Sequence, residues 1–367
     1  MPLTTVSEGR VYDWSHAVGH NAQRGPGFNY VQSMCLGKNG VIYTANRGSE
    51  NNFAMHCNKM QVGGPNEEEW LADFFEYGEG DGKCTRPFGV AVDDQDHVYV
   101  SDDWTNTISV FDSSGKFLRK WGKTGSGDGE LMRPAGLAIE KNGNVIVVDS
   151  GNDRLQVFTP DGKFVGKCGR SGSGDGEFNE PWGITLDKDG NIYVADWKNH
   201  RVQKLSPEGK FLMKFGEYGK VEAPEGAFAV THFGPYVSPA SETAHYPKPS
   251  LLNHPTDVAV DPDGDIYVTD WGNHRVCVFD PDGKPIANLI GDAQVLSKWG
   301  QQRVDANPDM AKARRRVRSL EPQWRFCFPT AVEFNPESDQ IIVADSMRNR
   351  LQVYKKVRDY SDFQANL

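Results

Sequence analysis

The chain has 367 residues, and its 50 Asp and Glu against 40 Lys and Arg give a formal net charge of −10 at pH 7. No apolar run is long enough to span a membrane. The acidic balance disfavours a general nucleic-acid surface, because phosphate binding needs clustered Lys and Arg. The 39 Gly and 21 Pro are typical of a globular protein with many turns.

Residues 1–10 lack the hydrophobic core of a targeting segment, so we expect a cytoplasmic protein, with removal of a signal as the alternative. The six cysteines are scattered, without a CxxC pair or a regular framework. This pattern favours reduced thiols over disulfides or a structural zinc site, with a Cys57–Cys84 bridge left open.

The stretch from Arg133 to Gly169 contains four strand-length apolar runs separated by turn signals: GLAI, NVIVV, RLQVF and KFVGK. This pattern predicts a four-stranded antiparallel meander, and it recurs along the chain. The copies open on Pro87, Pro134, Pro181, Pro255 and Pro329, with spacings of 47, 47, 74 and 74 residues. Because no unit has a core of its own, we expect residues 1–367 to form one β-propeller domain.

The first unit, about 30–78, is degenerate and has Val31 where the others have the proline. The next four units are expected at about 86–122, 133–169, 180–216 and 254–291. The last, about 328–356, has only three strands, and VYDWSHAVG at 11–19 supplies the fourth. An N-terminal strand that completes the last blade closes the ring and removes its exposed edges. The expected fold is all-β, with six four-stranded blades.

Three segments carry a family resemblance: SGNDRLQVFTPDGKF (150–164), DWKNHRVQKLSPEGKF (196–211) and DWGNHRVCVFDPDGKP (270–285) resemble NHL repeats. The resemblance extends over nearly the whole chain, because spacing, turn chemistry and order all recur. It implies a six-bladed propeller in which the first strand of each blade lines a central channel. In such blades, the turns between second and third strands open on the same face as the connections between blades.

Three insertions lengthen that face, at 47–58, 217–253 and 292–327. They predict a roof over one mouth of the channel. Long loops on a rigid scaffold usually carry function. A cap that only packs, or an oligomer contact, is the alternative.

The third insertion is expected to contain one short helix, 307–321, with Asn307 as its N-cap and Pro308 in its first turn. Its apolar stripe would be formed by Met310, Ala313, Val317 and Leu320. Its basic face is interpreted as solvated and consists of Lys312, Arg314, Arg315, Arg316 and Arg318.

Residues on either side of each opening proline should lie near the roofed mouth. The candidate substrate-binding residues are Tyr30, Arg86, Phe88, Arg133, Trp182, Thr256, Phe328 and Thr330. This set is aromatic with a few charges, which is typical of a pocket for a small organic ligand. Arg86 and Arg133 would bind a carboxylate or phosphate, or would pair with Glu180.

Glu180 and His254 are the candidate catalytic acid and base. They precede the proline in neighbouring blades, so both could face one ligand across a short gap. A mutual ion pair that merely closes the channel is the alternative.

The repeat arrangement is also distantly similar to that of the peptidyl-hydroxyglycine amidating lyases. VIYTANRGSE (41–50) resembles the turn that carries the arginine of those enzymes, which makes Arg47 a third catalytic candidate. A salt bridge to Glu50 or another exposed carboxylate is its alternative role. The zinc histidines of the lyases follow the opening proline, and the equivalent residues here are Phe88, Ala135, Trp182, Thr256 and Thr330. The resemblance therefore does not extend to their zinc chemistry.

Five histidines expected on or near the mouth are weak metal candidates: His20, His56, His232, His245 and His254. Three of them could converge on a divalent ion, but no tight spacing supports this, and solvated or hydrogen-bonded histidine is commoner. The cofactor is unknown, and a divalent metal is not favoured. Trp104, Trp197 and Trp271 follow second strands, where they would pack between turns or form an aromatic platform at the rim.

The favoured hypothesis is a propeller enzyme that acts on a small organic, anionic substrate by lyase, hydratase or hydrolase chemistry. The alternative is a non-catalytic NHL module that binds a protein or peptide on the same face. Nucleic acid and membrane are not expected partners, and the sequence leaves the oligomeric state open. The repeated SGSGDGE loop resembles a phosphate-binding loop, but no helix follows it, so a nucleotide site is not predicted.

Overall fold

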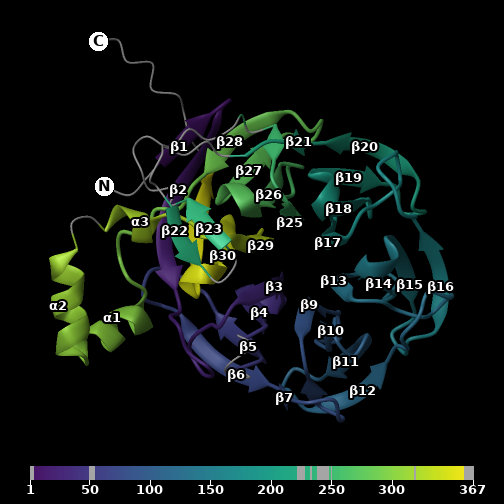
Figure 1. The fold of residues 1–367 in the computed structure, drawn as a ribbon, viewed down its shortest axis with the longest axis horizontal. Helices are drawn as coiled ribbons and strands as arrows, with labels where there is room; N and C mark the ends of the chain where they lie inside the picture. The colour runs from purple at the N-terminus through teal and green to yellow at the C-terminus, as the bar shows by residue number, and fades with distance from the viewer. Residues whose placement is uncertain are drawn as a thin grey trace.

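Six blades form a ring in the computed structural model (Figure 1), and side chains from all six inner strands line a cavity at its centre. The described residues are 4–48, 54–220, 248, 250–317 and 320–358, with the backbone alone for 228–231, 234–237 and 321–322. Within these ranges no helix is both long and apolar enough to cross a membrane. The predicted all-β, six-bladed propeller is confirmed.

Blades 1 to 5 are each a four-stranded antiparallel meander with the first strand innermost. Blade 1 consists of β3 (Val31–Leu36), β4 (Val41–Asn46), β5 (His56–Gln61) and β6 (Glu69–Phe74). Blade 2 consists of β9 (Pro87–Val92), β10 (Val98–Asp102), β11 (Thr107–Phe111) and β12 (Phe117–Trp121). Blade 3 consists of β13 (Pro134–Ile139), β14 (Val145–Asp149), β15 (Arg154–Phe158) and β16 (Phe164–Cys168).

Blade 4 consists of β17 (Pro181–Leu186), β18 (Ile192–Asp196), β19 (Arg201–Leu205) and β20 (Phe211–Phe215). Blade 5 consists of β25 (Pro255–Val260), β26 (Ile266–Asp270), β27 (Arg275–Phe279) and β28 (Pro285–Leu289). Three two-stranded sheets decorate the ring: β7 (Glu76–Tyr77) with β8 (Lys83–Cys84), β21 (Glu217–Tyr218) with β24 (Leu251–Leu252), and β22 (Phe228–Thr231) with β23 (Gly234–Val237).

The second strands are buried along their whole length in blades 2 to 5, because each blade is covered by a neighbour on both faces. This explains their continuous apolar runs, where an exposed sheet would show alternation. One core cluster, for example, joins Ile146 and Val148 of blade 3 to Ile192 and Val194 of blade 4. Each such side chain contributes about 1.5–3 kcal/mol by its burial.

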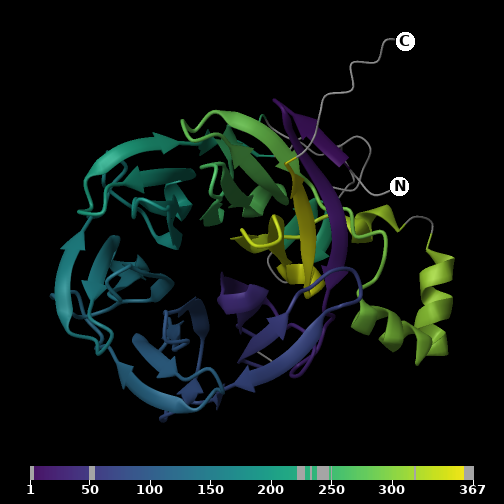
Figure 2. The same ribbon diagram turned by 180° about the vertical axis from the view of Figure 1, so that it is seen from behind.

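Blade 6 closes the ring with strands from both ends of the chain. It consists of β29 (Pro329–Asn335), β30 (Gln340–Asp345), β31 (Arg350–Val357), β2 (Arg10–Val18) and β1 (Thr4–Ser7). The predicted N-terminal closing strand is confirmed, since β2 pairs with β31 from Val11↔Val357 to Val18↔Leu351. Figure 2 shows β1 and β2, in purple, outside the yellow β31. The fifth strand, β1, was not predicted, because no other blade has a counterpart of it.

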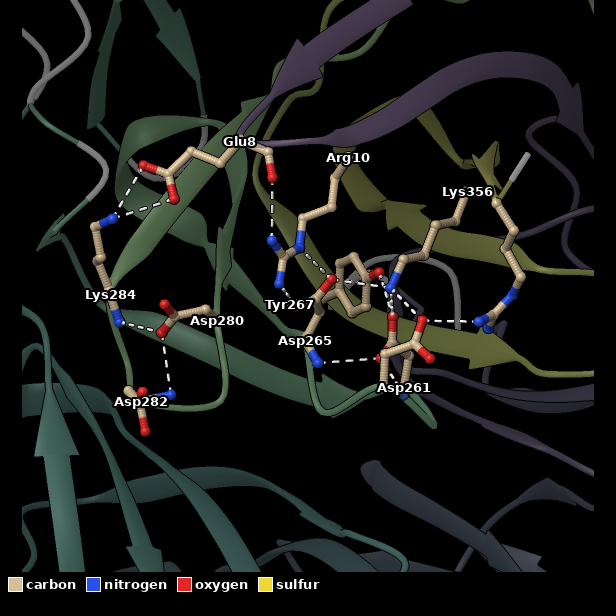
Figure 3. A network of polar contacts seen from close by, with 11 residues as sticks. Glu8, Arg10, Asp261, Asp265, Tyr267, Asp280, Asp282, Lys284 and Lys356 are labelled. Carbon is tan, nitrogen blue, oxygen red and sulfur yellow. Dashed lines mark hydrogen bonds and ion pairs between the residues drawn. The ribbon is translucent and has the colours of Figure 1, made fainter. Parts of the chain in front are cut away.

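A network of ion pairs fixes the closing strands to blade 5 (Figure 3). Lys356 of β31 is buried, and its Nζ lies 2.5, 2.9 and 2.9 Å from carboxylate oxygens of Asp261, Asp263 and Asp265. Arg10 of β2 adds a bidentate pair with Asp265, with both distances 2.8 Å. The turn after β25 therefore binds cations from both chain ends.

Three helices lie in the described part of the third insertion, where the sequence predicted one. They are α1 (Lys298–Asp305), α2 (Pro308–Arg316) and α3 (Glu321–Trp324). The predicted cap of α2 is confirmed, since Asn307 Oδ1 accepts hydrogen bonds from the amides of Asp309 and Met310. The predicted extent is wrong, because Val317 is in extended conformation and ends the helix. Ser297 caps the unpredicted α1 by accepting from the Gly300 amide.

Helices α1 and α2 lie outside the ring of blades, not over the channel (Figure 1). Ser297 Oγ donates to the carbonyl of Gly19, and Arg303 donates to that of Asn21. Trp299 packs against the core cluster shared by blades 6 and 1. The expected roof is therefore not formed by these two helices, because their contacts hold them at the seam where the ring closes. Most of the second insertion lies outside the described residues.

All six cysteines are free thiols, so the alternative Cys57–Cys84 bridge is not formed. Both of these side chains are buried in the core cluster between blades 1 and 2. Burial raises the pKa of both thiols, which keeps them protonated and unreactive at neutral pH.

Substituting Lys356 with Met is expected to lower the free energy of unfolding by about 3–5 kcal/mol, because it leaves three carboxylates without their shared cation. Urea denaturation measures this loss. The matched control is Lys355→Met on the exposed face of the same strand, which should change stability by less than about 0.5 kcal/mol. Equal effects of the two substitutions would show that the network does not hold the ring closed.

Candidate functional site

A buried polar side chain at the end of each second strand positions the connection that leads into the mouth. In blades 3 to 6 it is a fully buried aspartate: Asp149, Asp196, Asp270 and Asp345. Each accepts a backbone amide from the connection at 2.6–2.8 Å and pairs with an arginine five residues later at 2.7–2.8 Å. Asp102 and Asn46 accept the equivalent amides in blades 2 and 1.

In every blade except blade 2, the residue that precedes the first strand is then bound by the preceding blade. The backbone amides of Tyr30, Arg133, Glu180, His254 and Phe328 donate, at 2.6–3.1 Å, to Asn349, Asn106, Asp153, His200 and His274. We call these five hydrogen bonds the blade latches. All five donor residues have φ between 45° and 57°, a left-handed conformation that costs a non-glycine residue about 1–2 kcal/mol. The latches offset that cost and fix the side chains at the mouth.

The latches explain the role of His200 and His274 and the protonation state of their rings. Because Nδ1 of each accepts an amide proton, each ring must be neutral in the folded state. Burial and the charge of Arg348 lower the pKa of His274 to about 3. Burial also lowers the pKa of His200. These two histidines are therefore structural.

One side of the mouth is rich in arginine. Nε of Arg86 lies 3.1 Å and Nη2 of Arg47 lies 3.6 Å from the Asp103 carboxylate. Burial raises the pKa of Asp103 despite the opposing charges of Arg47, Arg86 and Arg133. The Arg86 guanidinium also lies over the ring of Trp104, which is 58% exposed. The predicted alternative partner of Arg47, Glu50, lies outside the described residues.

Glu180 joins the arginines to the next blade. It lies 3.2 Å from Arg133 and 2.6 Å from Lys198. Burial alone would raise the pKa of Glu180, but the hydrogen bonds and charges of Lys198 and Arg133 outweigh it, so the pKa is lowered. Of the alternatives considered for Glu180, the structure has the pair with Arg133 and none with His254 among the described residues.

The other side of the mouth is aromatic. Trp182 and Trp197 stack with centroids 4.6 Å apart and planes 4° apart, and Phe88 meets Trp182 edge-on at 5.1 Å. His254 packs on Trp197 at 4.6 Å. In the next blade, Phe328 lies 4.5 Å from Trp271. Of the three turn tryptophans, Trp197 and Trp271 therefore pack on aromatic neighbours and Trp104 remains open at the rim.

His254 is neutral at physiological pH. Its burial, together with the nearby His200 ring and the positive charge of Lys198, lowers its pKa to about 4. Nδ1 lies 2.8 Å from Asn253 Oδ1. Because a carbonyl oxygen only accepts, Nδ1 carries the proton and Nε2 is left as the basic nitrogen.

The two threonine candidates use their hydroxyls between blades. Thr256 Oγ1 donates to the carbonyl of Pro329, and Thr330 Oγ1 donates to that of Val31. Both side chains are buried. The structure thus brings the arginines, Glu180, His254 and the aromatic residues to the mouth, while these hydroxyls already have protein partners.

Two carboxylates inside the channel were not found from the sequence. Asp257 and Glu333 line a cavity of about 40 Å³ together with Cys35 and Trp182. They occupy the third and fifth positions of their inner strands, where the repeat has small residues such as Gly183 and Ala138. That comparison of equivalent positions would have revealed them.

The packing around Asp257 requires the small neighbour. A Cβ atom on Gly183 would lie 2.3 Å from Asp257 Oδ1, so a larger residue there would displace the carboxylate. Burial raises the pKa of Asp257 to about 8. Burial and the charge of Asp257 also raise the pKa of Glu333 well above its usual range. The channel interior therefore holds protons at neutral pH.

The histidine metal candidates do not come together. His20 lies beside α1, His56 is buried with Nδ1 2.9 Å from the Ala54 carbonyl, and His254 is at the mouth. His232 and His245 lie outside the described residues. Elsewhere in the described chain, no three His, Cys, Asp or Glu side chains are grouped as a metal site requires.

Comparisons with known proteins agree with this architecture. Residues 178–205 and 252–279 match the NHL repeat, and residues 89–155 match a family described as a 6-bladed beta-propeller. The chain thus carries NHL repeats in a six-bladed propeller. A 50-residue stretch is 52% identical to Protein lin-41 of Caenorhabditis elegans, covering 12% of this chain and 4% of that protein.

Solved structures share the fold at low sequence identity. A streptogramin B lyase has a TM-score of 0.54 at 12% identity, covering 94% of this chain and 98% of that one. A catalytically inactive virginiamycin B lyase from Staphylococcus aureus with quinupristin has a TM-score of 0.53 at 12% identity, with 94% and 100% covered. A protein of unknown function from Bacteroides thetaiotaomicron reaches 0.56 at 16% identity, with 94% and 76% covered. At sequence identities of 12–16%, these similarities show that the chains share a fold and nothing more.

The latch of blade 6 is tested by two substitutions at His274. His274→Ala leaves the part-buried Phe328 amide without an acceptor and should lower the free energy of unfolding by about 1–3 kcal/mol. His274→Asn introduces the residue found at the equivalent positions 106 and 349, which supplies an acceptor and tolerates positive φ. In urea denaturation at pH 7.5, His274→Asn should lose less than half of the free energy of unfolding that His274→Ala loses.

The latch at His274 also predicts how the stability of the protein depends on pH. An unfolded histidine binds a proton near pH 6.5, but folded His274 does so only near pH 3, so acid favours unfolding by about 1.4 kcal/mol per pH unit in that window. His274→Asn should therefore weaken the loss of stability between pH 6.5 and 4.5. An unchanged pH dependence would contradict the latch.

Asp257 generates the opposite pH dependence. Its folded pKa of about 8 lies above the unfolded value near 4, so its contribution to stability is lost as pH rises between them. Asp257→Asn removes this loss. The free energy of unfolding of the variant, measured relative to wild type, should therefore rise by about 1–3 kcal/mol between pH 6 and pH 9. The exposed Asp81→Asn is the control. A pH-independent effect of Asp257→Asn would contradict the raised pKa.

Proposed function

We propose that the channel mouth binds a small organic anion and that His254 acts on it as a general base, in lyase, hydratase or hydrolase chemistry. One observation carries the proposal: three cations, Arg86, Arg133 and Lys198, gather at the mouth around the carboxylates of Asp103 and Glu180. Lys198 also lies over the ring of Trp197, so positive charge adjoins the stacked tryptophans in a protein whose net charge is −10.

The anionic group would bind the arginines, since guanidinium groups form charge-assisted, bidentate hydrogen bonds with carboxylates and phosphates. Trp182 and Trp197 would contact the apolar body of the substrate. Because the two rings are already held in a stack, binding would cost little side-chain entropy, which favours affinity.

His254 is available to accept a proton at pH 7 because it is neutral there and Nε2 is its basic nitrogen, and its lowered pKa makes it a weaker base than a free imidazole. Lys198, whose charge acts on His254, and Arg133, which pairs with the same Glu180 as Lys198, would stabilise negative charge that develops on the substrate. The lowered pKa of Glu180 favours a positioning role, in which the ionised carboxylate holds Lys198 and Arg133 in place. The lyases with the same fold make elimination one chemistry to test first.

A non-catalytic binding role is the second candidate. Trp104 remains 58% exposed at the rim with Arg86 over its ring, an arrangement that suits an acidic peptide or protein partner. In that case binding at the mouth would occur without turnover.

The test combines binding and turnover for a panel of aromatic carboxylates and phosphate esters. A bound compound should raise the melting temperature by mass action. Arg86→Gln and Arg133→Gln should each weaken its affinity about tenfold, as expected for a lost charge-assisted hydrogen bond. Arg170→Gln, at an 81% exposed side chain paired with Glu177, is the matched control and should leave affinity unchanged.

Turnover separates the two candidates. His254→Gln should reduce kcat about 100-fold or more while changing affinity less than threefold, as expected for the loss of a general base. Unchanged turnover in this variant would remove His254 as the base. Binding to the mouth without turnover in wild type would favour the partner-binding role, and equal effects of Arg133→Gln and Arg170→Gln would remove the mouth as the site.

A further inference from the structure

A second cavity lies away from the channel, between α1, α2 and the edge of the ring. Its volume is about 590 Å³, within the range of small-molecule pockets. The ring side is formed by the connection that follows β2, including His20, and by blade 6. The proposed function does not use this cavity, and none of the mouth residues lines it.

The helix side of the cavity carries an apolar stripe. The stripe predicted for α2 lines it through Met310, Ala313 and Val317, joined by Val304 of α1 and Leu296. Met310 and Val317 are still 39% and 43% exposed, so the protein itself does not cover the stripe. An uncovered apolar face on a helix held at a fixed position suits an apolar ligand body.

The cavity also gathers positive charge. Arg303, Arg314, Arg348 and Arg350 line it, and no Asp or Glu among the described side chains does, although the protein as a whole is acidic. Arg350 is neutralised by Asp345 at 2.8 Å. The charge of Arg303 adds to burial in lowering the pKa of His20, and that of Arg348 adds to burial in lowering the pKa of Arg350. The positive charge of the arginines therefore acts on groups at the ring side of the cavity, namely His20 and Arg350.

We propose that this cavity binds a small amphiphilic anion, with one carboxylate, sulfonate or phosphate group on an apolar body. The apolar stripe of α2 would cover the body, and Arg303 and Arg314 would bind the charged group. Charge complementarity selects an anion over a neutral or cationic amphiphile. Because this site shares no residue with the mouth, it stands or falls separately from the proposed function.

Isothermal titration of the full chain with decanoate, 1-decanol and decylammonium tests the ligand class. Decanoate should bind at one site, with an affinity at least tenfold above that of 1-decanol, and decylammonium should not bind. Raising the salt concentration should weaken decanoate binding and leave 1-decanol unaffected, because salt screens only the charged group. Equal affinity for decanoate and decylammonium, or no binding of decanoate, would overturn the proposal.

Variants locate the site. Arg314→Gln should weaken decanoate binding about tenfold, while Arg315→Gln, on the same helix but outside the cavity, should not. Ala313→Trp should fill the groove and abolish binding of both decanoate and 1-decanol. Because Ala313 is exposed, this substitution should leave the melting temperature within about 2 °C.

Three results would contradict the location. Equal losses for Arg314→Gln and Arg315→Gln would indicate general charge attraction. Unchanged decanoate binding in Ala313→Trp would place the ligand elsewhere. A tenfold loss in Arg133→Gln would assign decanoate to the channel mouth.

Discussion

The buried carboxylate at the end of the second strand is the interaction on which the ring and its mouth depend. Asp149, Asp196, Asp270 and Asp345 have no solvent exposure, and each is satisfied by an arginine and by a backbone amide of the incoming connection. Losing either partner would leave a buried charge uncompensated. The connection is thereby held, the latch to the preceding blade forms, and the residue before the proline takes its left-handed conformation. The buried carboxylate that recurs in the repeat thus positions the side chains at the mouth.

Differences between blades give this scaffold its chemistry. At the mouth, equivalent positions carry arginine, glutamate or histidine, and their electrostatics diverge: Glu180 stays ionised, whereas His254 stays neutral. Inside the channel, Asp257 and Glu333 hold protons where the other blades have small residues. At the seam, the third insertion encloses a separate basic cavity between its helices and the ring.

The sequence predicted the fold because the repeat identifies the four strands of each blade, and the pair of Arg133 with Glu180, one of two roles considered for that arginine, is formed. It could not predict contacts that the repeat does not relate, such as Asp103 with Arg47 or the β1 strand. The roof was expected from loop length alone, but contacts of Ser297 and Trp299 with distant residues place α1 at the seam. Asp257 and Glu333 were overlooked although their positions in the repeat identify them.

The central claim is that the mouth binds an organic anion between its arginines and its tryptophan stack. The most direct measurement is an anomalous-scattering map from crystals soaked in 4-bromobenzoate, whose bromine marks the apolar end of the ligand. The account predicts bromine density beside Trp182 and Trp197, with the carboxylate directed to Arg86 and Arg133. A well-diffracting soaked crystal with no bromine at the mouth would contradict it.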